Sequence, residues 1–291
     1  MNIGPQYKPD DKFKARARLF QSKYRAEVLE VEFQDYGNRL TDPDAHALLN
    51  YYDKLNCRES LRNRYPTYSR DRDADMLRSE HIPFNLLAPL DTDRTAAIRI
   101  IEQVFHIECV SIDSIKLEYA PNPKESYLND GTSFDTYIEV TTVSGLKCGI
   151  GIEVKYTEHA YKLKRGSSEE SRVLDHQSSY WKTARESACF KNPDDELFGT
   201  DPFRQIWRNH LLGLKMIEMG DVDHFYSVTL FPDGNQHFHA VIPEYISQLK
   251  DEAKPFLIGC TFETFISAIN GSPEFEEWKD WLHRRYIVEN L

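Results

Sequence analysis

The sequence predicts an α/β (α+β) fold in which helices flank a mixed central β-sheet. Segments in which apolar residues recur at helical spacing are interspersed with segments in which apolar and polar residues alternate. From residue 91 onward the order is helix, strand, strand, strand, helix, strand, with an extra helical segment before the second long helix. We therefore expect an αβββαβ core over residues 91–231, within a single domain that spans residues 1–291.

Two further regions are expected to add to this core. Residues 1–90 form an N-terminal helical region, with helices predicted over residues 11–32 and 42–55. Residues 57–75 are rich in arginine and broken by a proline, so we expect a loop or arm there. Residues 232–291 form a C-terminal addition. No internal repeat or low-complexity linker divides the chain, which favours one domain.

Local signals define the individual core elements. A helix is predicted over residues 91–106, where Asp91 or Thr92 can cap the first turn and apolar residues recur on one side. A helix over residues 202–219 has Pro202 near its start, where proline is tolerated. The remaining predicted elements are two strands, residues 109–119 and 222–231, and a helix around residues 172–185.

A β-hairpin is predicted over residues 133–157, because two alternating runs flank a short turn. The positions expected to share the core face are all even-numbered: Phe134, Thr136, Ile138, Val140 and Thr142, then Leu146, Cys148, Ile150, Ile152 and Val154. Facing residues must therefore have numbers with an even sum. A three-residue loop, residues 143–145, achieves this with Thr142 opposite Leu146, and Gly145 can adopt the left-handed conformation such loops use.

This register places Asp135 opposite Glu153 on the other face, with Lys155 two residues further along. Facing side chains on paired strands are about 5 Å apart, and like charges there are destabilising. A divalent cation would neutralise the two acids, and a lysine beside it can orient or deprotonate a water or stabilise charge on a phosphate. A solvated polar face in which Lys155 bridges two exposed acids is the simpler alternative. Gly149 and Gly151 share this face and favour close approach by a ligand or another backbone.

Asp135 on one strand and Glu153-Val154-Lys155 on the next resemble the active-site signature of the PD-(D/E)XK nuclease superfamily. The nearest group is made up of restriction-endonuclease-like bacterial proteins described only as superfamily members. Phe134 stands where the signature has proline. Three other segments are similar to that group: SEHIPFNLLAPL at residues 79–90, RQIWRNHLLGLKM at residues 204–216 and WKDWLHRRYI at residues 278–287. The resemblance spans most of the chain and implies a restriction-endonuclease-like core.

The resemblance implies a Mg²⁺-dependent nuclease that hydrolyses phosphodiester bonds in DNA rather than RNA, of the endodeoxyribonuclease type. Asp135 and Glu153, with the backbone carbonyl of Val154, would hold one or two Mg²⁺ ions, for which Mn²⁺ could substitute. Lys155 would assist the attacking water. Glu80 opens the SEHIPFN segment and would join the catalytic set as a further acid, with a surface glutamate as the alternative.

Two residues of the predicted helix 202–219 are candidates for substrate binding. Gln205 and Arg208 lie three positions apart and can share one face toward the site. The guanidinium of Arg208 matches the geometry of a phosphate, although packing against the sheet is an equal alternative. His237 and His239, expected on one strand face, could form a metal site with His224, but nothing else near them has the character of a zinc ligand.

The charge balance limits the kind of nucleic-acid binding that is possible. The 291 residues contain 36 Lys and Arg against 47 Asp and Glu, a formal net charge of −11, which argues against tight, indiscriminate binding. Phosphate contact is local, however, and arginine beside tyrosine can bind phosphate and stack on unpaired bases. The basic clusters are Arg58, Arg62, Arg64, Arg70 and Arg72 around Tyr65 and Tyr68; Lys162, Lys164 and Arg165; and Arg284 and Arg285. A solvated charged face is the alternative for each.

Other features indicate where the protein acts and with what. No run approaches the roughly 20 apolar residues of a membrane span, and the N-terminus lacks the apolar core of a signal peptide. Five scattered cysteines favour reduced thiols, so we expect a cytoplasmic protein without membrane contact.

DNA is the expected partner, and a homodimer or a partner protein is compatible with the sequence. No GxSxG or Walker-type motif is present. The alternative function is a non-catalytic nuclease-fold module that binds nucleic acid or a protein.

Overall fold

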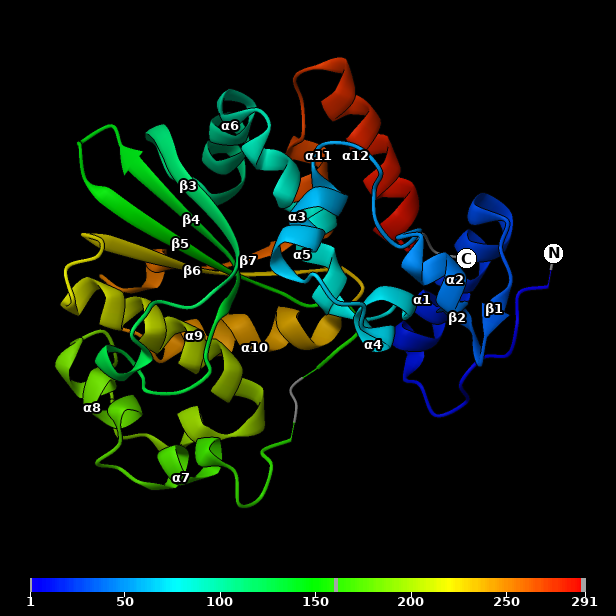
Figure 1. The fold of residues 1–291 in the computed structure, drawn as a ribbon. Helices are drawn as coiled ribbons and strands as arrows, with labels where there is room; N and C mark the ends of the chain where they lie inside the picture. The colour runs from blue at the N-terminus through cyan, green and yellow to red at the C-terminus, as the bar shows by residue number, and fades with distance from the viewer. Residues whose placement is uncertain (1, 160–161, 289–291) are drawn as a thin grey trace.

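A five-stranded mixed β-sheet forms the centre of the computed structural model, which describes residues 2–159 and 162–288 (Figure 1). The strands are β3 (Cys109–Tyr119), β4 (Phe134–Thr142), β5 (Lys147–Val154), β6 (His224–Phe231) and β7 (Leu257–Thr261). They lie in the order β3-β4-β5-β6-β7, with antiparallel pairing from β3 to β5 and parallel pairing from β5 to β7. The predicted mixed sheet flanked by helices is confirmed.

Helices cover both faces of this sheet (Figure 1). One apolar core joins it to α5 (Ile82–Leu86), α6 (Arg94–Phe105), α11 (Phe262–Ala268) and α12 (Pro273–Tyr286). A second apolar core on the other face joins it to α8 (Ser179–Glu186), α9 (Asp201–Glu218) and α10 (Gln236–Ser247). The order α6, β3, β4, β5, α9, β6 matches the predicted αβββαβ core. The segment after residue 231, expected only as an addition, also contributes the fifth strand, β7, while the single-domain assignment stays a prediction.

The register of the hairpin agrees with the parity expected from the sequence. Ile138 pairs with Ile150, and the backbone N–H of Thr142 donates to the carbonyl of Leu146 at 2.9 Å. Gly145 has a φ of +81°, the left-handed conformation that the three-residue loop requires. The same pairing therefore fixes which residues face each other at the other end of the two strands, where Asp135 and Glu153 lie.

Two details of the hairpin differ from expectation. Phe134 does not share the core face of Ile138: it is the first residue of β4, where alternation no longer fixes its direction, and its ring lies on the opposite face, 5.2 Å from the ring of Phe225. A Cβ atom on Gly151 would lie 2.4 Å from Phe225 and 2.6 Å from Phe134. Gly149 likewise leaves room for Tyr137 and Phe225. The glycines thus admit aromatic side chains beneath α9 rather than a ligand.

The N-terminal region packs at one end of the sheet (Figure 1). The predicted helix over residues 11–32 consists of α1 (Lys12–Lys23) and a π-helical turn, Tyr24–Leu29, and ends at Glu30, which is left-handed. A small ribbon of β1 (Phe33–Gln34) and β2 (Tyr36–Leu40) follows. Only α2 (Asp42–His46) of the predicted helix 42–55 is helical, because Leu48 and Leu55 adopt left-handed φ values.

The predicted arm over residues 57–75 is not a loop. It contains α3 (Cys57–Arg64) and α4 (Arg70–Ala74), separated by a turn at Pro66. The helix expected around residues 172–185 is also two helices, α7 (Ser168–Leu174) and α8, because Asp175 is extended. Asp93, rather than Asp91 or Thr92, caps α6. Short 3-10 turns cover Ser79–His81, Ala88–Asp91, Lys124–Ser126, Glu196–Gly199 and Lys254–Phe256.

Two of the segments that resemble the nuclease group pack against each other. The indole N–H of Trp278 in α12 donates to the backbone carbonyl of Asn85 at 2.8 Å. The amide of Asn85 in turn donates to the hydroxyl of Tyr286 at 2.7 Å. These buried contacts give the segments at residues 79–90 and 278–287 a structural role. No helix within residues 2–159 and 162–288 is long and apolar enough to cross a membrane.

Candidate active site

Three neighbouring strands carry a row of carboxylates, formed by Glu118 on β3, Asp135 on β4 and Glu153 on β5. Glu118 lies between the pairs Leu117–Thr136 and Tyr119–Phe134, which sets it across from Asp135. The next pair beside Asp135 is Thr136–Ile152, which sets Asp135 across from Glu153. The twisted sheet therefore brings together three acids that are far apart in sequence, and we call them the carboxylate row.

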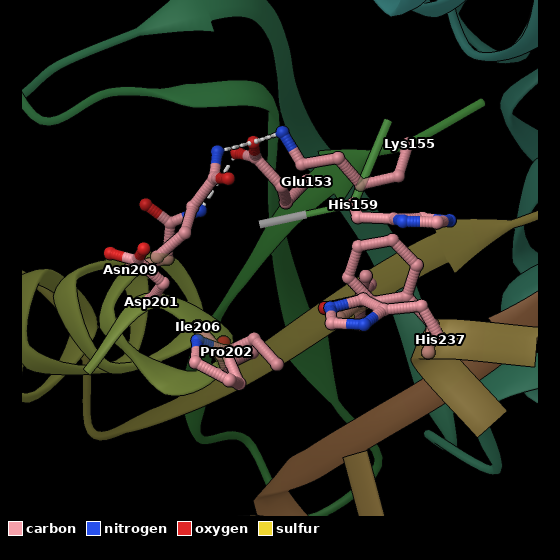
Figure 2. Close-up of a pocket in the computed structure, with 13 residues that line it drawn as sticks. Glu153, Lys155, His159, Asp201, Pro202, Ile206, Asn209 and His237 are labelled. Carbon is pink, nitrogen blue, oxygen red and sulfur yellow. Dashed lines mark hydrogen bonds and ion pairs between the residues drawn. The ribbon is translucent and has the colours of Figure 1, made fainter. Parts of the chain in front are cut away.

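Glu153 is held by side chains from two elements (Figure 2). The ammonium group of Lys155 lies 2.7 Å from Oε1 of Glu153, and Nε2 of Gln205 donates to the same oxygen. Nδ2 of Asn209 donates to Oε2 at 2.7 Å. Gln205 and Asn209 are four residues apart on α9, so they project from one face of that helix. The packing of α9 on the sheet thus orients Glu153.

Asp135 is fixed by the backbone of the neighbouring strand. Its Oδ2 atom accepts the N–H of Val154 at 2.7 Å. A polar cavity of about 210 Å³ opens beside it and is lined by Thr132, Asp135, Glu153, Gln205, Arg208 and Asn209, among others. Asp135 and Glu153 of the row thus face a space that can admit a small charged group.

Burial and mutual repulsion shape the protonation of this row. Burial, together with the charges of Glu153 and Glu118, raises the pKa of Asp135 well above its usual value. Burial also raises the pKa of Glu118 to about 7, aided by the charges of Glu153 and Glu80. Burial lowers the pKa of Lys155, but the charges of Glu153 and Asp135 outweigh it and raise the pKa overall. Lys155 is thus held as a cation beside Glu153.

The other predicted site residues fall in different places. Gln205 contacts Glu153, as expected from its helical position. Arg208 lines the same cavity, yet its guanidinium lies 3.3 Å from Asp130 and 3.0 Å from Glu169. Glu80 is exposed and pairs with Arg78 at 3.5 Å, so its link to the row is electrostatic, through Glu118. The roles given to these residues stay predictions.

Reasoning from the sequence missed two residues of the site. Glu118 lies in the predicted strand 109–119, but only the register of β3 with β4 shows that it faces Asp135. It also has a left-handed φ of +51°, an uncommon conformation for glutamate. Asn209 could have been found as the residue four positions after Gln205 on the same helix.

The histidines do not form the metal site that was considered. His237 and His239 lie on α10 rather than on a strand, because residues 236–247 are helical. The ring of His237 stacks on His159 at 5.1 Å, and His224 stacks on Phe256 at 5.4 Å. Within residues 2–159 and 162–288, no three His, Cys, Asp or Glu side chains are grouped closely enough to hold a metal ion by themselves.

The donor chemistry of the carboxylate row nevertheless fits a hard divalent cation. Mg²⁺ is usually held by one or two carboxylates and keeps several waters, so three clustered protein ligands are not needed. Asp135 and Glu153 supply two carboxylates, and the carbonyl of Val154 directly follows Glu153 in the chain. Burial raises the pKa of Asp135, and the charges of Glu153 and Glu118 add to this effect against that of Lys155, so a bound cation would favour the ionised carboxylate.

The fold and this row define a class of nuclease-like α/β proteins, with an acid on each of two antiparallel strands and a lysine two residues after the second acid. A family model described as the PD-(D/E)XK nuclease superfamily matches residues 8–288, nearly the whole chain. The chain belongs to the PD-(D/E)XK nuclease superfamily. Searches of curated proteins and of solved structures found no match.

Proposed function

We propose that the protein is a metal-dependent nuclease that hydrolyses phosphodiester bonds in DNA, with the carboxylate row as its centre. The observation that carries this proposal is the arrangement of Asp135, Glu153 and Lys155 on paired strands within a chain of this superfamily. A site built only for the Glu153–Lys155 ion pair would not need Asp135 as a second acid acting on the same lysine.

In this proposal Asp135, Glu153 and the carbonyl of Val154 hold one or two Mg²⁺ ions, for which Mn²⁺ can substitute. Bound at this point, the cation would polarise the scissile phosphate and lower the pKa of an attacking water. Lys155 orients that water and stabilises the negative charge that develops on the phosphate. Gln205 and Asn209 keep Glu153 aligned, which limits the reorganisation needed when substrate arrives.

The distribution of cations supports a nucleic-acid substrate despite the net charge of −11. Several arginines of the basic clusters serve the fold: Arg72 pairs with Asp73 at 2.8 Å, and Arg285 donates to Gln21 and Asn50. Lys162, Lys164 and Arg165 differ, because they belong to an exposed loop near the site. The N–H of Leu163 in that loop donates to Asp201 at 3.2 Å, and Asp201 lines a pocket with Glu153 and Lys155.

Incubation of purified protein with closed circular and linear DNA, in Mg²⁺ or Mn²⁺, tests the proposal. Asp135→Ala and Lys155→Ala should each reduce cleavage by at least about 100-fold, because each removes charge that acts in the transition state. Glu139→Gln is the matched control: it neutralises another acid of β4, paired with Lys147 at 3.2 Å near the hairpin turn, and should retain activity. Full metal-dependent cleavage by both active-site variants would refute the proposal.

A non-catalytic module that binds nucleic acid or a protein is the second candidate. It is favoured by one observation, namely that both carboxylate oxygens of Glu153 are already engaged by Lys155, Gln205 and Asn209. Such a module would bind DNA without cutting it, and neither Asp135→Ala nor removal of metal would change its affinity appreciably.

A further inference from the structure

A cavity of about 150 Å³ lies in the N-terminal region and is lined by residues of α2, α3 and α4 and the turns beside them. The rings of His46, Tyr65 and Tyr68 contribute to its walls, together with the guanidinium groups of Arg62 and Arg72. The proposed hydrolysis uses none of these residues. Concave sites with aromatic walls and a few fixed polar groups are typical of ligand binding.

The aromatic wall is held in place before any ligand binds. The rings of His46 and Tyr68 stack with centroids 4.0 Å apart and planes 27° apart. The hydroxyl of Tyr68 donates to Asp42 at 2.9 Å. Stacking of a further flat ring on such a fixed wall would cost little conformational entropy.

The buried side of the cavity carries a fixed polar pair. Nε and Nη2 of Arg72 each lie 2.8 Å from an oxygen of Asp73, and the hydroxyl of Tyr51 donates to Asp73 at 2.6 Å. Both Arg72 and Asp73 are buried. The hydrogen-bonding groups of Arg72 and Asp73 are largely satisfied by each other and by Tyr51. The cavity therefore favours stacking on a base over hydrogen bonding to the edge of a particular base.

Tyr65 connects the cavity to the carboxylate row. Burial raises the pKa of Tyr65 to about 12, with the nearby charge of Glu118 adding to it, and its ring lies under the guanidinium groups of Arg64 at 4.8 Å and Arg72 at 4.3 Å. Arg64 also donates to the backbone carbonyl of Glu118 at 3.3 Å. The cavity therefore lies next to the Glu118 end of the row, within reach of a nucleic-acid strand that extends from the row in this direction.

Arg62 and Arg64 supply exposed positive charge at this place. Both lie in the last turn of α3, and neither has a carboxylate ion-pair partner among residues 2–159 and 162–288. Guanidinium groups match the geometry of phosphate oxygens. Aromatic rings beside such cations are the usual elements that hold unpaired nucleotides.

We propose that this cavity binds one unpaired nucleobase of the substrate strand, with Arg62 and Arg64 on the adjacent phosphates. The inference rests on the proposed function and specifies its substrate class as nucleic acid with a single-stranded segment. An engineered protein cavity of about 150 Å³ accepts a benzene-sized ring. The six-membered ring of one base is therefore of a size that this cavity accepts, whereas a base pair is far larger.

The test measures the fluorescence of 2-aminopurine placed at successive positions in single-stranded, flapped and fully paired oligonucleotides. The Asp135→Asn variant serves as the non-cleaving background, with Ca²⁺ present. We expect quenching at one position of the single-stranded and flapped probes, and no quenching in the duplex. Tyr68→Ala should abolish the quenching and weaken binding of the single strand about 5- to 100-fold. Tyr68→Phe, which keeps the ring, should retain both.

Two controls separate this effect from damage to the fold or from general loss of charge. Tyr7→Ala removes an exposed tyrosine that packs edge-on against Tyr36 and should leave quenching unchanged. Lys147→Ala removes a cation near the hairpin turn and should leave the preference for single strands unchanged, whereas Arg62→Ala should reduce it. The thermal unfolding temperature of each variant reports whether it folds.

Equal affinity for single-stranded and duplex probes, or quenching that persists in folded Tyr68→Ala, would overturn the inference. If the wild type cuts DNA but the probes show no position-specific quenching, the cavity proposal fails while the proposed function stands. If the probes are quenched but the wild type never cuts, the proposed function fails while the cavity remains a nucleotide site.

Discussion

Glu153 accepts hydrogen bonds from the side chains of Lys155, Gln205 and Asn209. This arrangement fixes its charge beside Asp135 before any ligand binds. Burial raises the pKa of both Asp135 and Glu118, and repulsion from the neighbouring carboxylates adds to this effect. At the scale of single residues, the site therefore stores unfavourable electrostatic energy that a cation would relieve.

Glu118→Gln should stabilise the metal-free protein at pH 8. The pKa of Glu118 rises from 4.5 to about 7 on folding, so folding takes up a proton between these pH values. The free energy of unfolding consequently falls as the pH rises through this window and stays reduced above it. The variant removes this loss, and we expect a gain of about 1–2 kcal/mol at pH 8 and a smaller gain at pH 5.

Thermal unfolding in EDTA at pH 5 and pH 8 measures this effect. Glu108→Gln is the control, since Glu108 is an exposed acid just before the other end of β3 and should show little change at either pH. The unfolding temperature of the wild type should fall between pH 5 and pH 8 relative to that of Glu118→Gln. The absence of such a fall would contradict the raised pKa of a buried Glu118.

At the scale of elements, the contact between α9 and the sheet positions Glu153. Phe134 and Phe225 fill the space over Gly151, and Phe225 also occupies the space beside Gly213 of α9. The glycines thus allow α9 to approach closely enough for Gln205 and Asn209 to reach Glu153.

Gly151→Ala should destabilise the protein by about 1–3 kcal/mol, because its Cβ would lie 2.4 Å from the Phe225 ring in a packed core. The shift of α9 that relieves this clash should also weaken metal-dependent cleavage. Chemical denaturation together with the cleavage assay measures both effects. Gly131→Ala, where no atom lies within 4 Å of the added methyl group, should be nearly neutral for stability. Equal stability of the two variants would show that the Gly151 contact does not position α9.

The hairpin could be predicted from sequence because its register follows from alternation and loop length alone, both of which are local. Glu118 could not be predicted, because its place opposite Asp135 depends on the pairing of β3 with β4 across a loop containing Pro121 and Pro123. The direction of Phe134 was predicted wrongly, since tertiary packing with Phe225 outweighs alternation at the end of a strand. Likewise, α3 and α4 were missed because their charged sequences show little apolar periodicity, and their few buried residues pack through tertiary contacts.

At the scale of the whole molecule, a net charge of −11 requires local cations if DNA is to bind. The exposed loop with Lys162, Lys164 and Arg165 lies near the pocket that contains Glu153 and Lys155. This loop and the Arg62–Arg64 turn of α3 are therefore the expected contacts with the phosphate backbone.

Replacing Lys162, Lys164 and Arg165 with alanine should weaken DNA binding and flatten its dependence on salt. Each lost phosphate contact lowers the slope of log affinity against log salt by about 0.9 for duplex DNA, so we expect a change of about 1–3. Fluorescence anisotropy of labelled DNA between 50 and 200 mM salt, roughly the range over which such contacts dominate, measures the slope. A Lys147→Ala, Lys182→Ala, Lys250→Ala triple variant removes the same number of positive charges and controls for net charge. An equal change in that variant would argue against a contact specific to the loop.

Calorimetric titration of the metal-free protein with Mg²⁺ tests most directly whether the carboxylate row is a metal-dependent catalytic centre. We predict saturable binding to the wild type that is lost in Glu153→Gln, because the substitution removes one of the two proposed carboxylate ligands and leaves an amide of the same shape. Glu139→Gln should bind as the wild type does. Undiminished Mg²⁺ binding by folded Glu153→Gln, or no Mg²⁺ binding by the wild type either alone or with DNA, would contradict the account.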